Sequence, residues 1–188
     1  MTHTRQLAWE VRRIAIGLLM IHLHLRVNGF DLLPDVMGWL QIALAVWNPA
    51  LEREQPKTAL LRGFALALGL WSLVELAEWL GLELPGWTGP VSLTMGLVSI
   101  YFYFQLLTEL AQLAEKYPVE GGNLAGGLLK GRTWLTVLRT ASVLLMSLRV
   151  DQDVLTVVVL VVLLAQFCCV LLVIAHLFVL AKGLERSM

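Results

Sequence analysis

The chain has 188 residues, of which 58% are hydrophobic and 15% are charged, and its formal net charge at pH 7 is zero. A soluble protein of this composition would have too little polar surface to cover its core, whereas in lipid the apolar side chains can face outward. The neutral charge and the lack of a basic arm exclude a nucleic-acid partner. The composition therefore predicts an integral membrane protein whose partner is the lipid bilayer.

Six apolar segments predict helices, near residues 9–29, 35–48, 63–82, 91–113, 133–150 and 154–181. Crossing a bilayer takes about 20 residues, and the segment 35–48 reaches only about 21 Å at ~1.5 Å per residue. We expect one all-α domain, residues 1–188, that forms a polytopic transmembrane bundle of about six helices. The alternative is four spans plus a re-entrant helical hairpin made by the first two segments.

The basic residues predict the orientation of the bundle. Lys and Arg fall on alternate connections and at both ends of the chain: Arg5, Arg12, Arg13, Arg53, Lys57, Arg62, Lys116, Lys130, Arg132, Lys182 and Arg186. By the positive-inside rule these connections lie in the cytoplasm, as do both termini. The connection 114–132 holds five glycines, which predicts a mobile loop.

Polar side chains recur at helical spacing on several segments, which places them on one face of each helix. Such faces are expected to point inward, either to line a polar cavity or only to pack helices together. On the fourth segment, one such row contains Thr94, Tyr101 and Gln105. A second row lies on roughly the opposite face and contains Ser92, Gly96, Ser99 and Tyr103. The residues expected to form the polar lining are His22, Thr94, Tyr101, Gln105, Gln166 and His176.

Ionisable side chains at membrane depth are the sharper signal, because each is costly in hydrocarbon unless it is paired or hydrated. Glu75 and Glu78 lie three residues apart, and Trp71 precedes Glu75 by one helical turn. Other charged residues are expected at the same outer end of the bundle. The candidate ligand-binding residues are Glu75, Glu78, Arg26, Arg149, Asp31, Asp35 and Trp71.

A structural alternative has the arginines pair with these acids and fasten the helices to the outer loops. Arg139, in the fifth segment, is expected to snorkel to the interface or to pair with Glu109.

Several site classes are not supported by the sequence. His22 and His24 are two residues apart, so on a helix they point roughly 200° away from each other and do not form a metal site. No known catalytic motif is present, and no catalytic residue, metal or cofactor is predicted.

Three functions remain open. The first is a small-solute binding or transport-related module with an outward-facing polar site. The second is a structural or assembly protein that acts through a membrane protein partner or as a homo-oligomer. The least favoured is an intramembrane enzyme.

The turn Asn28-Gly29-Phe30-Asp31-Leu32-Leu33-Pro34-Asp35, continued by Val36-Met37-Gly38-Trp39, resembles a motif of small multi-pass membrane proteins of Gram-positive bacteria. The resemblance implies a bacterial cytoplasmic membrane protein and attaches no chemistry to it.

A second resemblance is architectural. The chain is similar in size and expected topology to the S subunits of energy-coupling-factor vitamin transporters, which bind their ligand near the outer face. It departs from them on the first helix, where those subunits carry small residues four apart. Here Ala15 is followed four positions later by Leu19, and Gly17 by Ile21.

Overall fold

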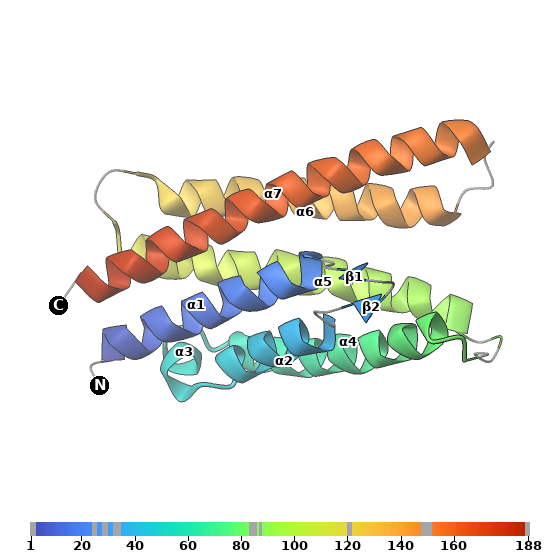
Figure 1. The fold of residues 1–188 in the computed structure, drawn as a ribbon. Helices are drawn as coiled ribbons and strands as arrows, with labels where there is room; N and C mark the ends of the chain where they lie inside the picture. The colour runs from blue at the N-terminus through green and yellow to red at the C-terminus, as the bar shows by residue number, and fades with distance from the viewer. Residues whose placement is uncertain are drawn as a thin grey trace.

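The computed structural model describes residues 3–23, 26–27, 30–31, 35–82, 86, 88–119, 122–147 and 152–186. These residues form seven helices and one pair of two-residue antiparallel strands, in which Arg26 lies opposite Asp31 (Figure 1). The elements in chain order are α1 (His3–His22), β1 (Arg26–Val27), β2 (Phe30–Asp31), α2 (Asp35–Val46), α3 (Pro49–Glu54), α4 (Thr58–Trp79), α5 (Thr88–Lys116), α6 (Leu124–Ser147) and α7 (Gln152–Arg186).

Three stretches of the described helices are long and apolar enough to cross a membrane: Thr58–Glu78 in α4, Thr88–Lys116 in α5 and Thr156–Arg186 in α7. The all-helical prediction is therefore confirmed, whereas the described residues give three candidate spans where the sequence predicted about six. Helix α6 has 24 residues but includes the basic residues Lys130, Arg132 and Arg139. Helix α2 has only 12 residues.

Six helices form a ring in which each contacts the next, in the order α1, α2, α4, α5, α6, α7 and back to α1. The first and last helices lie side by side, and both termini lie at the same end of the bundle (Figure 1). We call the half of the bundle that contains the termini the closed half, and the other half the open half.

Helices α1 and α2 pack closely through two glycines. A Cβ atom on Gly17 would lie 2.7 Å from the carbonyl oxygen of Gly38, and one on Gly38 would lie 2.6 Å from the carbonyl oxygen of Gly17. Only a residue without a side chain allows the two backbones to approach so closely. The pair therefore behaves as one tightly packed unit within the ring.

This pair reaches only to the middle of the longer helices. At the end of α1 the ring of His22 lies 5.8 Å from that of Tyr103, which is at the middle of α5. Near the start of α2, Trp39 packs on Phe102 at 5.3 Å and against Gly69, which is at the middle of α4. The end of α1 and the start of α2 thus lie at mid-height, and α4 to α7 continue beyond them (Figure 1).

The buried side chains follow the same division. Among the described side chains, the last buried residues towards the open half are Ser72 in α4, Ser99 in α5, Leu135 in α6 and Val170 in α7. Beyond them the helices expose large apolar residues such as Leu160. The hydrophobic core therefore fills the closed half, where the ring is complete.

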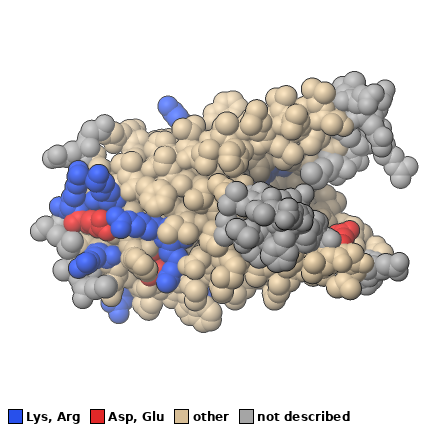
Figure 2. Space-filling model, viewed as in Figure 1, with Lys and Arg blue, Asp and Glu red and all other residues tan. Residues whose placement is uncertain are grey.

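Charged side chains gather at the end with the termini (Figure 2). Glu54 of α3 accepts hydrogen bonds from His3 and Lys116, and Arg12 of α1 pairs with Glu185 of α7 at 2.7 Å. These contacts tie α3 to α1 and α5, and α1 to α7. The closed half is therefore stabilised by polar contacts at the end with the termini as well as by its hydrophobic core.

One connection differs from the prediction. The glycine-rich segment was expected to be a mobile loop, but α6 begins at Leu124 and includes Gly127 and Gly131. A Cβ atom on Gly127 would lie 2.6 Å from His176 Nε2, and one on Gly131 would lie 2.6 Å from Val173 Cγ2. Because these glycines lack a side chain, α6 can pack closely on α7, and this packing favours the helix over a loop.

Helix α3 was also not predicted from the sequence. Asn48 and Pro49 end α2, and they begin the next helix as well: the Asn48 side chain accepts a hydrogen bond from the Ala50 backbone N–H at 2.9 Å, and Pro49 occupies the first turn. Proline suits that position because its missing N–H would be unsatisfied there anyway.

Candidate functional site

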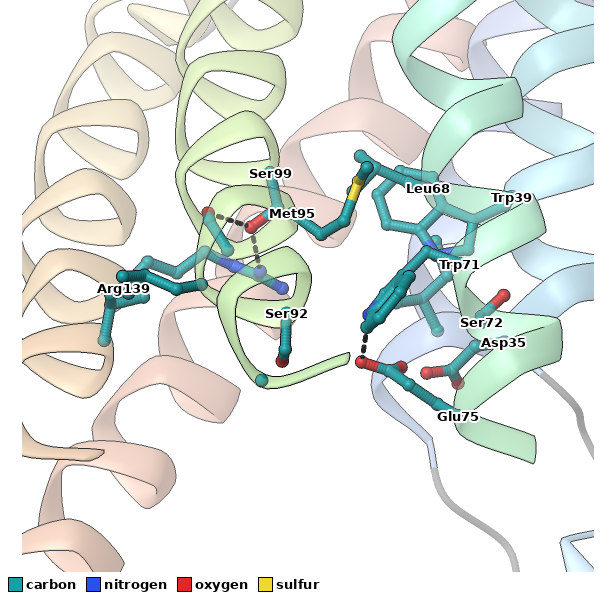
Figure 3. A pocket seen from close by; sticks show the side chains of 15 residues that line it. Asp35, Trp39, Leu68, Trp71, Ser72, Glu75, Ser92, Met95, Ser99 and Arg139 are labelled. Atoms are coloured by element: carbon teal, nitrogen blue, oxygen red, sulfur yellow. Dashed lines mark hydrogen bonds between the residues drawn. The ribbon is translucent and has the colours of Figure 1, made fainter. Parts of the chain in front are cut away.

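A cavity of about 440 Å³ lies where α1 ends and α2 begins, between the open-half portions of α4, α5 and α6. Its volume is within the range of small-molecule sites, about 300–1,000 Å³. Figure 3 shows the side chains around it. The lining residues are Ile21, Asp35, Trp39, Leu68, Trp71, Ser72, Glu75, Gly89, Ser92, Leu93, Met95, Gly96, Ser99, Arg139 and Val143.

One wall of the cavity comes from α4 and the start of α2. Leu68, Trp71, Ser72 and Glu75 follow each other at helical spacing, which places all four on one face of α4. The indole N–H of Trp71 donates a hydrogen bond to a carboxylate oxygen of Glu75 at 2.7 Å. Asp35, the first residue of α2, lies beside Glu75 (Figure 3). This wall is therefore acidic and aromatic.

The opposite wall comes from α5 and α6. Arg139 of α6 donates a hydrogen bond to the Ser99 hydroxyl of α5 at 2.8 Å, and Ser99 in turn donates to the Gly96 carbonyl at 2.7 Å. The helices approach closely here, since a Cβ atom on Gly96 would lie 3.2 Å from Val143 Cγ2. Ser92 lies one turn further towards the open end. This wall is therefore basic and hydroxylic.

On the side of the closed half, Arg139 contacts two aromatic rings. Its guanidinium carbon lies 4.3 Å from the centre of the Tyr103 ring, and one terminal nitrogen lies 3.5 Å from His22 Nε2. A guanidinium stacked on an aromatic face gains a cation–π attraction and keeps a fixed orientation. The Nε atom of Arg139 is buried and has no hydrogen-bond partner.

Opposite charges thus share one cavity without direct pairing. Among the residues that the structure describes, no carboxylate forms an ion pair with Arg139. Figure 3 shows Arg139 on one side, and Asp35 and Glu75 on the other. A site with separated charges of both signs can bind and orient a polar molecule that enters between them.

Three of the seven candidate ligand-binding residues are brought together here: Asp35, Trp71 and Glu75. Glu78 is exposed on α4 and does not line the cavity. Arg26 lies in β1 and Asp31 in β2, but their side chains are outside the described part of the structure, and Arg149 is outside it altogether.

The residues expected to form the polar lining do not form one surface. Thr94 and Tyr101 are exposed on α5, and the Thr94 hydroxyl bonds the backbone of its own helix. Gln105 donates to Glu109 within α5, and among the described side chains Glu109 forms no ion pair with Arg139. The expected inward stripe of α5 is wrong for Thr94 and Tyr101, because the opposite row with Ser92 and Ser99 faces the cavity.

Three further lining candidates lie apart from one another. His22 lies beside Arg139, on the side of the cavity that faces the closed half. Its Nδ1 is 2.9 Å from the Leu18 carbonyl oxygen. Gln166 accepts a hydrogen bond from Ser142 at 3.4 Å, and His176 packs against Gly127 in the closed half. Of these, only His22 contacts a residue of the cavity wall.

Arg139 was the main residue that the sequence did not assign to the site. The predicted helix 133–150 placed it near the cytoplasmic end, whereas α6 begins at Leu124 and brings it to mid-height. The row of Ser92, Gly96 and Ser99 was visible in the sequence. Its spacing showed that these residues share a face, but did not show which face of α5 meets α6.

Comparisons with protein-family models, with curated proteins and with solved structures found no match to this chain.

Proposed function

We propose that this protein is an integral membrane protein that binds a small polar solute from the outer side, as a binding or transport-related module. In this proposal α4 to α7 cross the bilayer, and α1 and α2 form a re-entrant pair that enters from the cytoplasmic side. The observation that carries the proposal is the charged cavity at the level where this pair ends.

Helix lengths support four spans. At ~1.5 Å per residue, α4 to α7 are about 33 to 52 Å long, against a hydrocarbon thickness of about 30 Å. Helix α2 is about 18 Å long, which is too short to cross. In the first half of α1, Glu10 bonds with Asn48 and Arg13, and Arg12 pairs with Glu185. These charged contacts lie at the closed end, so only the second half of α1 lies at membrane depth.

The charged end supports the orientation. Basic side chains gather where both termini lie, which by the positive-inside rule is the cytoplasmic end (Figure 2). The cavity lies in the other half, which in this orientation is the outer half. The resemblance of the segment 28–39 to bacterial multi-pass proteins supports the bacterial cytoplasmic membrane as its location.

The cavity is better suited to a ligand than to packing alone. Polar residues that only join helices bond the protein itself, as Ser142 does with the Leu138 carbonyl of its own helix and with Gln166 of α7. Arg139, Asp35 and Glu75 instead line one cavity from opposite walls, and charged groups at membrane depth are stabilised by polar surroundings. A polar solute in this space would interact with both walls.

The test is purification in mild detergent, followed by mass spectrometry of co-eluting small molecules and proteins. The blocking variant is Ser92→Trp, which places a large side chain in the cavity from an exposed position on its wall. The matched control is Thr94→Trp, which adds the same side chain to an exposed position of α5 outside the cavity.

We expect a small molecule to be retained by the unaltered protein and by Thr94→Trp, and to be lost from Ser92→Trp. A stoichiometric protein partner without any small molecule would overturn the proposal in favour of an assembly protein. An ATP-hydrolysing partner found together with a bound solute would support an uptake subunit specifically.

A further inference from the structure

The two walls of the cavity differ in the sign of their charge. Asp35 and Glu75 lie on the wall made by α2 and α4, and Arg139 lies on the wall made by α5 and α6 (Figure 3). No ion pair joins the two sides among the described side chains. The walls therefore create an electric field across the space between them.

This arrangement discriminates between kinds of ligand. A simple cation would be attracted by the carboxylates but repelled by Arg139, and a simple anion would meet the reverse. These interactions strengthen where a bound molecule displaces water, because the effective dielectric constant is then lower. A molecule with a positive and a negative end gains at both walls and is held in one orientation.

Each wall also carries groups suited to one end of such a molecule. On the acidic side the Trp71 ring is held in place by its bond to Glu75, and an aromatic face attracts ammonium groups, quaternary ones included. On the basic side the Ser99 hydroxyl lies beside the guanidinium. The terminal nitrogens of Arg139 contact Ser99 and His22, and each carries a second hydrogen that an incoming anionic group can accept.

Resting on the function proposed above, we infer that the cavity binds a small zwitterion. Its ammonium end lies between Asp35, Glu75 and Trp71, and its carboxylate or phosphate end lies at Arg139 and Ser99. This chemistry has two sources: a free solute, or the headgroup of a zwitterionic phospholipid that enters from the open half.

The test is calorimetric titration of the purified protein with glycine betaine and with glycine. Choline and acetate serve as probes that carry only one of the two charges. We expect the zwitterions to bind at least tenfold more tightly than choline or acetate. The inference is overturned if neither zwitterion binds at millimolar concentration, or if either single-charge probe binds as tightly.

Charge-removing variants test both walls. Arg139→Gln and Glu75→Gln are each expected to weaken zwitterion binding by at least tenfold, while Glu78→Gln, on the same helix but outside the cavity, leaves it unchanged. Circular dichroism and gel filtration establish that each variant is folded. Undiminished binding by folded Arg139→Gln and Glu75→Gln would overturn the inference.

The same titrations separate this inference from the proposed function. If choline binds, Ser92→Trp abolishes its binding and Arg139→Gln does not weaken it, the cavity is a solute site but not a zwitterion site. If Ser92→Trp changes the binding of no probe and releases no co-purified molecule, the proposed function fails as well.

Nanodiscs distinguish the two sources. Betaine affinity is compared in discs of phosphatidylcholine and of phosphatidylglycerol. Weaker binding in phosphatidylcholine shows that the lipid headgroup competes for the cavity, and equal binding shows that a free zwitterion is the ligand. Both outcomes support the inference, whereas weaker binding in phosphatidylglycerol alone contradicts it, because an anionic headgroup would then be the better competitor.

Discussion

The contact between α1 and α2 gives a prediction with a matched control. In Gly17→Ala the new Cβ atom would lie 2.6 Å from Ile42 Cγ1 and 2.7 Å from the Gly38 carbonyl oxygen, so one of the helices must move. In Gly63→Ala, on α4, no atom lies within 4 Å of the new Cβ atom. Both changes replace a helical glycine by alanine.

The difference between the two variants isolates the steric cost. Alanine favours a helix by about 1 kcal/mol over glycine, and this contribution stabilises both variants equally. Overpacking a tight contact costs about 1–3 kcal/mol of stability, and this cost applies only to Gly17→Ala. We therefore expect Gly17→Ala to be less stable than Gly63→Ala by about 1–3 kcal/mol, with Gly63→Ala at or above the stability of the unaltered protein.

The assay is unfolding by sodium dodecyl sulfate in mixed micelles, followed by circular dichroism. The midpoint for Gly17→Ala should lie at a lower detergent fraction than that for Gly63→Ala. Equal midpoints, or a more stable Gly17→Ala, would refute the close packing of α1 on α2. In that case α1 and α2 would not form one tightly packed unit.

Two further predictions concern the closed end. Asn48→Ala removes the cap of α3 and the bond to buried Glu10, so it should lower the unfolding free energy in the same assay by about 1 kcal/mol or more, and an unchanged midpoint would contradict the capping role. The hydrogen bond from Lys116 holds the pKa of Glu54 below its ordinary value of 4.5, so its contribution to stability is complete above about pH 4.5 and is lost as the pH falls through the folded-state pKa. Lys116→Gln should therefore reduce the stability lost between pH 6 and pH 3, measured by detergent unfolding across that range, and an identical pH profile would contradict this assignment.

The helical class and most helix positions could be predicted from the sequence, because apolar segment length reports directly on membrane helices. The errors lie where tertiary contacts decide. Gly127 and Gly131 favour a loop in isolation, yet packing against α7 makes them part of α6. The predicted segment 35–48 ends close to the end of α2 at Val46, but the sequence did not show that Asn48 and Pro49 begin α3.

The α4 part of the acidic wall could be predicted because it depends on spacing within one helix. Trp71 and Glu75 are four residues apart, and their hydrogen bond follows from that spacing. The basic wall could not be predicted in this way. The position of Arg139 opposite them depends on where α6 begins and on which face of α5 it packs against, and neither is encoded in local periodicity.

The central structural claim is that α1 and α2 enter the membrane to mid-depth and form the floor of the cavity. The most direct measurement is the depth of nitroxide spin labels in liposomes, from their accessibility to oxygen and to a water-soluble nickel complex. The labels replace Met37 near the start of α2, Trp47 just after its end and Leu80 at the end of α4, all three being exposed. The background variant lacks Cys168 and Cys169.

We predict that the label at position 37 lies near the bilayer centre, while those at 47 and 80 lie close to opposite interfaces. A label at position 37 as shallow as that at position 80 would show that α2 crosses the whole bilayer, which contradicts the re-entrant pair and the cavity floor built on it.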